Sequence, residues 1–317
     1  MDFNKARKFH RMLLQIKNND VIELSFRDNE LTDDDCEKFQ EILAKNTSLK
    51  CLACSLRQSK GVTAVANALK VNSSLTSLSI ERDSITVFKS WSSIGNIPDC
   101  IGPEAAAAIS DVLKVNSSLT LLRITGHEIG YAGLFAIAEA LKVNSSLTSL
   151  DLRRNSIDAE GAFAIAEALK VNSFLTSIYL DWNHIRDEGA FAIAEALKVN
   201  SSLTLLSLVN NFITDEGALA LANALKVNLS LTSLYLHRND IGHNRALEIA
   251  KVLRFHPSVS KFVFERNFRE CFDGFPNLPI NTQQYLKGLL QLLIDKDGAQ
   301  VLSNQFRMTF SVKICYE

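Results

Sequence analysis

The chain has 317 residues, of which 47% are hydrophobic and 22% are charged. This composition is typical of a globular protein with ample material for a core, which excludes an intrinsically disordered or collagen-like chain. The 34 Lys and Arg residues nearly balance the 35 Asp and Glu residues, and the net charge of -1 gives no bulk attraction to nucleic acid or anionic lipid. We therefore expect neither nucleic acid nor a membrane as the partner.

The N-terminal segment, residues 1–20, is rich in Lys and Arg and has no apolar stretch long enough for a secretory signal. No run elsewhere approaches the roughly 20 apolar residues of a membrane span. The six cysteines are scattered through a chain that is large enough to need no disulfides, which suits a reducing compartment. We therefore expect a cytoplasmic protein. A helical cap is predicted over residues 1–20 by the spacing of Phe9, Met12, Leu13 and Ile16.

One phrase, ALKVNSSLTSL, recurs with little change between residues 68 and 234. Strand-like cores of the form LxxLxL follow a 28-residue period, apart from one interval of 26 and one of 44. Nine such units make up a repeat domain over residues 21–267. Their cores begin at Val21, Leu49, Leu75, Leu119, Leu147, Leu175, Leu203, Leu231 and Val259.

Each unit predicts one short strand and one helix, as the unit that begins at residue 147 illustrates. Its inward-pointing strand residues are Leu147, Leu150 and Leu152. Its outward-pointing residues are Thr148, Ser149, Asp151, Arg153 and Arg154. The amphipathic helix that follows, within residues 158–172, buries the face formed by Ala162, Ile165, Ala166 and Leu169.

An asparagine follows the predicted helix of most units. We expect Asn172 to take the left-handed conformation that ends a helix, close to Lys170, whose charge suits the helix dipole. The same position creates six N-x-S/T sequons, for which the sequence favours a role in ending the helix over glycosylation. These are Asn46, Asn72, Asn116, Asn144, Asn200 and Asn228.

Every strand and helix pair is joined in the same direction, so the strands form a parallel sheet and the helices form a second layer. Helices are about 10 Å across whereas strands lie about 4.8 Å apart, so the stack must curve. The sequence therefore predicts an α/β solenoid, a curved horseshoe of about nine 28-residue repeats. Its strands line the concave face and its helices line the convex face.

The motif LxxLxLxxN followed by a helix, at a 28-residue period, resembles the leucine-rich repeat of the ribonuclease-inhibitor type over about residues 13–267. That family includes ribonuclease inhibitors, the sensing ends of NOD-like receptors, Ran GTPase-activating proteins and effectors of intracellular bacteria. The resemblance implies a solenoid that holds another macromolecule, with buried asparagines whose amides bond the backbone of adjacent turns. The units here are uniform rather than alternating and Cys-rich, so inhibition of ribonucleases is not implied.

The pattern breaks near the longest interval. Three consecutive units lack the ladder asparagine and have Arg57, Asp83 and His127 instead. The 44-residue interval adds an insertion at about residues 86–103, between a strand and a helix. Its apolar residues Phe88 and Trp91 either fold over the gap in the ladder or form a secondary contact loop held by the rigid scaffold.

Residues 268–317 leave the repeat and predict a C-terminal cap. A linker with two prolines precedes an amphipathic helix within residues 282–294. Residues 306–316 alternate between apolar and polar side chains, which predicts a strand. We expect a monomer in which this strand is part of the cap; the alternative is a dimer formed through the same strand.

No arrangement of residues predicts a catalytic site, a metal site or a cofactor. The one metal-like motif joins Cys51 and Cys54, but the strand register directs their side chains to opposite faces and no second ligand pair follows. The histidines lie in turns or near helices without an evident nucleophile beside them. Neither a P-loop nor a dinucleotide-binding glycine motif is present. We therefore predict that the protein is not an enzyme.

Stacking the outward positions of neighbouring strands predicts an aromatic contact surface on the concave face. Tyr, Trp and Arg most often dominate interfaces, and an open strand face has no packing need for them; the alternative is that these aromatic residues are incidental. Acidic residues interrupt any basic track, which favours a protein over a nucleic acid as partner. The candidate contact residues are Arg154, Tyr179, Trp182, Leu205, Val209, Tyr235, His237 and Arg238.

The sequence thus predicts a non-enzymatic scaffold that grips a protein of unknown identity through its concave strands. One alternative is a regulator of a small GTPase or another enzyme, by resemblance to Ran GTPase-activating proteins, although their acidic tail is missing. Another is a bacterial effector delivered into the host cytosol, an origin with which the near-identical repeats are compatible. The solenoid alone does not decide among these functions.

Overall fold

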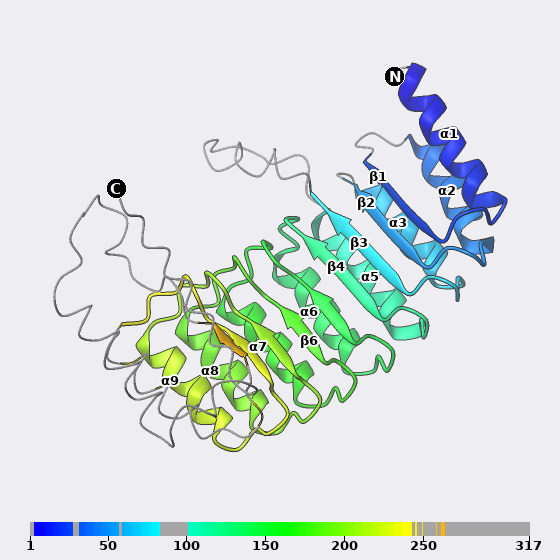
Figure 1. Ribbon diagram of the computed structural model, residues 1–317. Coiled ribbons are helices and arrows are strands. Elements are labelled where there is room, and N and C mark those ends of the chain that lie inside the picture. Colours follow the sequence, from blue (N-terminus) through cyan, green and yellow to red (C-terminus); the bar gives the residue numbers. More distant parts are fainter. Residues whose placement is uncertain are drawn as a thin grey trace, which may run out of the picture.

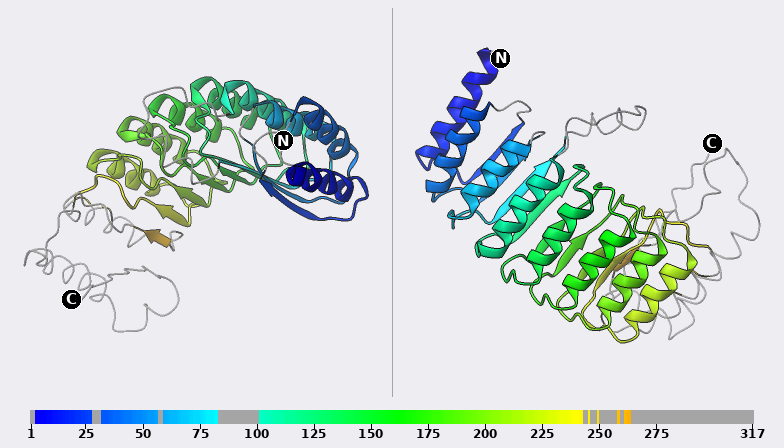
Figure 2. Two further views of the ribbon diagram at one scale, coloured as in Figure 1. Left: turned by 90° about the horizontal axis from the view of Figure 1, so that it is seen from above. Right: turned by 180° about the vertical axis from the view of Figure 1, so that it is seen from behind.

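The computed structural model describes residues 3–27, 32–56, 59–82 and 101–242, together with 245, 249, 258 and 261–263. Within these residues nine parallel strands form one sheet whose spatial order, β1 to β9, follows the chain. Figure 1 shows the strands side by side with the helices packed behind them. Seen from above, the layers form an arc with the helices on the outside and the strands on the inside (Figure 2). The predicted α/β solenoid is therefore confirmed.

Each strand is three to five residues long and pairs in parallel with the strand of the next repeat. The strands are β1 Glu23–Arg27, β2 Cys51–Ser55, β3 Ser77–Glu81, β4 Leu121–Thr125, β5 Ser149–Asp151, β6 Ser177–Tyr179, β7 Leu205–Ser207, β8 Ser233–Tyr235 and β9 Lys261–Val263. The helices described are α1 Phe3–Lys17, α2 Asp33–Lys45, α3 Ser59–Leu69, α5 Gly102–Val115, α6 Gly130–Leu141, α7 Ala159–Leu169, α8 Arg186–Leu197 and α9 Asp215–Leu225.

The core lies between the sheet and the helices and runs through all the repeats described. Leu147, Leu150 and Leu152 are each 0% exposed, as the strand pattern predicts. On α7 the buried face includes the four predicted residues, Ala162, Ile165, Ala166 and Leu169. Each fully buried leucine contributes roughly 1.5–3 kcal/mol, and it does so only because neighbouring repeats cover it.

Small residues let consecutive helices approach closely. Gly189 on α8 illustrates the constraint, because a Cβ atom there would lie 2.6 Å from Ile185 Cγ2 and 2.8 Å from Ala162 Cβ. Equivalent glycines occur in the preceding and following helices, at Gly133, Gly161 and Gly217. Close packing therefore determines the distance between neighbouring helices in the outer layer, which is larger than the distance between neighbouring strands.

The asparagine at the end of each helix acts through its side chain, and the left-handed conformation predicted for Asn172 is wrong. The Asn172 amide Nδ2 donates to the carbonyl oxygens of Leu141, at 2.7 Å, and Asn144, at 3.1 Å, in the preceding repeat. Its Oδ1 accepts from the backbone N–H of Leu175 at 2.8 Å. The side chain thus joins two repeats and the start of the next strand, which explains its recurrence without any unusual backbone angle.

A second asparagine ladder follows the strands. Asn183 Oδ1 accepts from the backbone N–H groups of Asn155 and Ile157, both at 3.0 Å, while its Nδ2 donates to the Leu180 carbonyl at 2.8 Å. Asn155, Asn211 and Asn239 make corresponding bonds to neighbouring turns. The buried ladder implied by the resemblance is confirmed for these four positions; Asn29, Arg57, Asp83 and Asn267 lie outside the described residues.

Helix α1 lies beside α2 at the N-terminal end of the stack (Figure 1). The four residues expected to face the core from this helix, Phe9, Met12, Leu13 and Ile16, are all buried. The ring of Phe9 contacts those of Phe26 and Phe39 edge-on, each at a centroid distance of 6.4 Å. These contacts cover the first strand and helix pair.

The insertion predicted at residues 86–103 lies between β3 and α5, and only its last three residues are described. Ile101 is 0% exposed and its carbonyl accepts a 2.6 Å hydrogen bond from Ser59 Oγ. Phe88 and Trp91 lie outside the described residues, as does the predicted C-terminal cap over residues 268–317. None of the helices in the described part is long and apolar enough to cross a bilayer.

Candidate functional site

The concave face presents columns of side chains that repeat along the stack. The strand register places Asp151 beside Arg123 and Tyr179, then Tyr179 beside Ser207 and Ser207 beside Tyr235. This is the order expected from the 28-residue spacing, so the predicted stacking of outward positions is confirmed. Neighbouring members of one column are close enough to form a continuous surface.

A second column occupies the turns that follow the strands. From Gly126 onward, its described members all have positive φ angles between 55° and 79°: Gly126, Arg154, Trp182, Asn210 and Arg238. The left-handed conformation costs roughly 1–2 kcal/mol for residues other than glycine. Arg and Trp are therefore kept at positions where glycine would be less strained, which is typical of functional surfaces.

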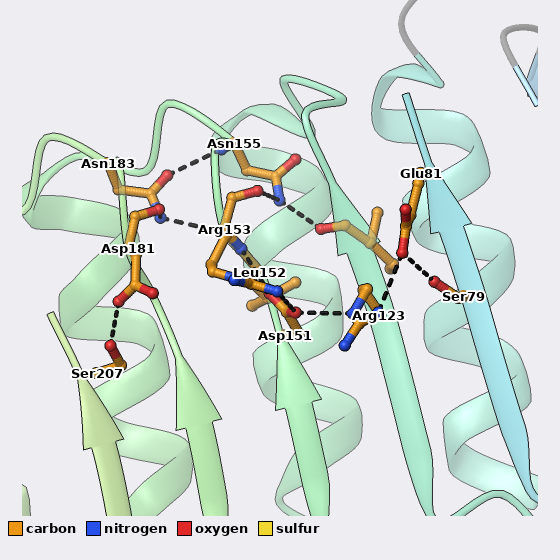
Figure 3. A network of polar contacts seen from close by, with 11 residues as sticks. Ser79, Glu81, Arg123, Asp151, Leu152, Arg153, Asn155, Asp181, Asn183 and Ser207 are labelled. Carbon is orange, nitrogen blue, oxygen red and sulfur yellow. Dashed lines mark hydrogen bonds and ion pairs between the residues drawn. The ribbon is translucent and has the colours of Figure 1, made fainter. Parts of the chain in front are cut away.

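Charged groups join adjacent strands at the centre of this face (Figure 3). Arg123 lies between two carboxylates, 3.1 Å from Glu81 and 2.9 Å from Asp151. Arg153 pairs with the same Asp151 at 2.6 Å, and this hydrogen bond is the main reason that the pKa of Arg153 is raised. Asp151 points to the concave face as expected, but the two guanidinium groups cover it and leave it only 4% exposed.

Asp181, in the turn after β6, is a second largely buried acid. Burial raises the pKa of its carboxyl, while hydrogen bonds from Ser207 Oγ and the Val209 N–H oppose that shift. Val209 itself is only 6% exposed, so its side chain offers almost no area to a partner, in contrast to its place among the candidate contact residues.

The other candidate contact residues remain accessible and several contact one another. Trp182 is half-buried, and the guanidinium carbons of Arg154 and Arg238 lie 5.3 and 5.5 Å from its ring centroid. Tyr235 and His237 meet edge-on at 6.5 Å. The remaining two, Tyr179 and Leu205, are half-buried on β6 and β7. The structure thus brings Arg154, Trp182 and Arg238 into one cluster and places Tyr235 and His237 in another.

Sequence reasoning missed a further aromatic pair at this edge. His184 and Phe212 stack at 5.4 Å with an interplanar angle of 9°, and Phe212 is 44% exposed. The two residues are 28 positions apart, so the same column reading that selected Trp182 would have found them. The ion-pair cluster around Asp151 carries a similar signal, because Arg123 and Asp151 are neighbours of opposite charge in one column.

The CxxC motif does not bring its two sulfurs together on one face. Cys54 is buried in the core, where burial raises the pKa of its thiol to about 12, whereas Cys51 is half-exposed on the other face of β2. Among the residues that the structure describes, no group of His, Cys, Asp and Glu has a metal-binding arrangement.

A cavity of about 330 Å³ lies next to Trp182, at the concave strands and the turns that follow them. Its walls include Arg82, Arg123, Arg153, Arg154 and Asp181. The cavity is polar, open to solvent on the concave side and bounded by side chains from four consecutive repeats. It therefore suits a charged group more than an apolar one.

Comparison with known protein families identifies the repeat. The family described as "Leucine Rich repeat" matches residues 115–138, 143–166, 171–194 and 199–222. No curated protein sequence matches the chain. Among solved structures, "Leiomodin-1 Actin-Binding Site 2 (ABS2)" is 25% identical with a TM-score of 0.43, covering 60% of this chain and 95% of that chain.

Two further solved structures show weaker likeness. The tropomodulin C-terminal domain of Caenorhabditis elegans is 13% identical with a TM-score of 0.42, covering 48% of this chain and 91% of that one. A protein of Bacteroides fragilis is 14% identical with a TM-score of 0.40, covering 84% of each chain. From the family match and the parallel stack of strand and helix units, the chain contains leucine-rich repeats, a repeat that generally mediates contacts between proteins.

Proposed function

We propose that the protein is a non-enzymatic scaffold of ribonuclease-inhibitor-type repeats that binds a protein partner through its concave face. The observation that carries this proposal is the run of accessible Tyr, Trp and Arg side chains on β6 to β8 and the turns after them. Within the described residues the helices lie on the outer side of the arc, so none of them covers the inner side of the sheet that carries these residues (Figure 2).

The chemistry of this surface suits a protein interface. Aromatic side chains provide a large contact area with few rotamers to lose, and Trp182 and Tyr235 stand on a rigid stack of repeats. The strands and asparagine ladders hold these positions before a partner arrives, which reduces the ordering cost of binding. The ion pairs around Asp151 provide a polar margin next to the aromatic centre.

A pair of matched triple variants tests the proposal. The concave variant carries Tyr179→Ala, Trp182→Ala and Tyr235→Ala. The control carries Phe135→Ala, Phe163→Ala and Phe191→Ala on the convex helices. These three phenylalanines are 45%, 56% and 42% exposed. Both variants and the unchanged protein are compared by thermal unfolding and then used to capture partners from a cell lysate.

We expect the concave variant to lose a specifically captured protein that the convex control retains, because only the first removes the aromatic centre. Truncation of an aromatic residue that is a hot spot of an interface costs about 2 kcal/mol or more. Capture that persists in the concave variant and disappears in the convex control would reject the concave site.

A further inference from the structure

Two exposed arginines on the concave edge are held without a carboxylate partner. Arg154 and Arg238 both lie over the ring of Trp182, at 5.3 and 5.5 Å. Across the described part of the chain neither guanidinium makes an ion pair, whereas the neighbouring Arg123 and Arg153 are both paired with carboxylates. The cluster therefore keeps cationic hydrogen-bond donors available beside an aromatic face.

The adjoining cavity of about 330 Å³ extends this cluster. Arg154 and Trp182 belong to its wall, and so does Gly126. In the turn column Gly126 holds the position that Arg154 and Trp182 hold in the next two repeats, so the hollow lies where the column has no side chain. A group that enters the cavity thus lies beside Arg154.

The charges around the cavity distinguish one anionic group from a continuous polyanion. Arg123 and Arg153 are bound to Asp151 and Glu81, and Asp181 also lines the cavity. A nucleic acid backbone that runs across the strands would meet these acids in the repeats of β3, β5 and β6, which opposes binding. A single carboxylate or phosphoryl group in the cavity beside Arg154 would accept charge-assisted hydrogen bonds, and the four arginines of the cavity wall outnumber its two acids, Glu81 and Asp181.

We propose that Arg154, Arg238, Trp182 and the adjoining cavity form a subsite for an anionic side chain in an acidic segment of the protein partner. The anionic group is a carboxylate or a phosphoryl group. This inference rests on the proposed function, since it names the partner chemistry that the concave face selects.

Labelled peptides of one design provide the probes, with a central run of Glu, phosphoserine, Gln or Lys. Fluorescence anisotropy measures their binding to the full chain, to the double variant Arg154→Gln with Arg238→Gln, and to Arg186→Gln. Arg186 is a matched control because it is also an exposed arginine with a positive φ, of 56°, but it begins α8. A labelled single-stranded oligonucleotide serves as the polyanion probe.

We expect the Glu or phosphoserine peptide to bind and the Gln and Lys peptides not to bind. The double variant should weaken that binding at least about tenfold, as the loss of charged hydrogen bonds predicts, while Arg186→Gln leaves it unchanged. Binding of the phosphoserine peptide alone assigns a phosphoryl ligand, and binding of the Glu peptide assigns a carboxylate. Added salt should weaken the interaction.

Three results would overturn the subsite. These are equal binding to the double variant and the unchanged protein, absence of binding by both acidic peptides up to about 1 mM, and oligonucleotide binding as tight as that of the acidic peptides. The two proposals can fail separately. If the concave triple variant loses its captured partner but the arginine variant keeps it, the concave interface stands and the anionic subsite is wrong.

Discussion

His127 occupies a position where the next four repeats have a ladder asparagine. Its side chain is 0% exposed, and burial, aided by the nearby positive charge of Arg82, lowers its pKa to about 4. An amide at this position has an acceptor available, because Asn155 donates to the Ile124 carbonyl at 2.7 Å and Ile80 pairs with Ile124 in the sheet. A single residue thus changes a hydrogen-bonded ladder position into a buried titratable one.

We predict that His127→Asn changes stability near neutral pH by no more than about 1 kcal/mol, because an amide hydrogen bond to the Ile80 carbonyl replaces the interaction of the imidazole with the Ile80 backbone. It should also remove a pH dependence. The folded pKa of His127, about 4, is below the ordinary value of 6.5, so the unfolded chain binds the proton first. The stability of the folded chain that depends on a neutral His127 is complete above pH 6.5. It is lost as the pH falls toward 4, with a slope of at most about 1.4 kcal/mol per pH unit.

Urea unfolding of both proteins at neutral pH and near pH 5 measures this effect. The stability difference between His127→Asn and the unchanged protein should widen at the lower pH. A difference that stays constant over this range would show that His127 does not titrate differently in the folded and unfolded chains.

Between elements, the close approach of consecutive helices depends on a small residue in each. Gly189 of α8 faces Ala162 of α7, and the hypothetical Cβ contact of 2.8 Å between them is shorter than real Cβ contacts. The strands of consecutive repeats can therefore keep the same register only if their helices stay closely packed in the outer layer.

We predict that Gly189→Ala destabilises the protein, because overpacking costs roughly 1–3 kcal/mol against a gain of about 1 kcal/mol in helix propensity. Removing the facing methyl group with Ala162→Gly should relieve part of the strain. Urea unfolding of the two single variants and the double variant gives the coupling energy. The double variant should lose less than the sum of the single losses; simple additivity would argue against this contact.

For the whole molecule, the strand and helix of each repeat pack against those of the adjacent repeats, so stability is expected to spread along the stack rather than centre on one core. The N-terminal end is closed by the contact of Phe9 with Phe39, and Phe39 is 0% exposed. A defect there should loosen the nearest repeats first.

We predict that Phe39→Ala costs about 3–5 kcal/mol locally. Hydrogen exchange followed by mass spectrometry should show lost protection in β1 to β3, while β5 to β8 keep theirs. Uniform loss of protection along the chain would mean that the solenoid unfolds as one cooperative unit.

The repeat makes the strands, helices and concave columns predictable, because a fixed period determines both register and facing direction. What it does not encode are contacts that depend on distances between repeats. The burial of Asp151 requires Arg123 and Arg153 to reach over it, and the contact of Arg238 with Trp182 spans two repeats. The role of Asn172 was missed for the same reason, since its partners Leu141 and Asn144 belong to the preceding repeat.

The helix-end asparagines also decide what chemistry their sequons can undergo. All six residues are at most 8% exposed, and the Nδ2 of each already donates to a backbone carbonyl of the preceding repeat or, for Asn46, of α1. A sugar joined to that nitrogen would replace a donated hydrogen and would have to fit between two closely packed turns. Attachment of a glycan and closure of the repeat stack are therefore mutually exclusive at these positions, so the folded chain hides acceptor sites that its sequence displays.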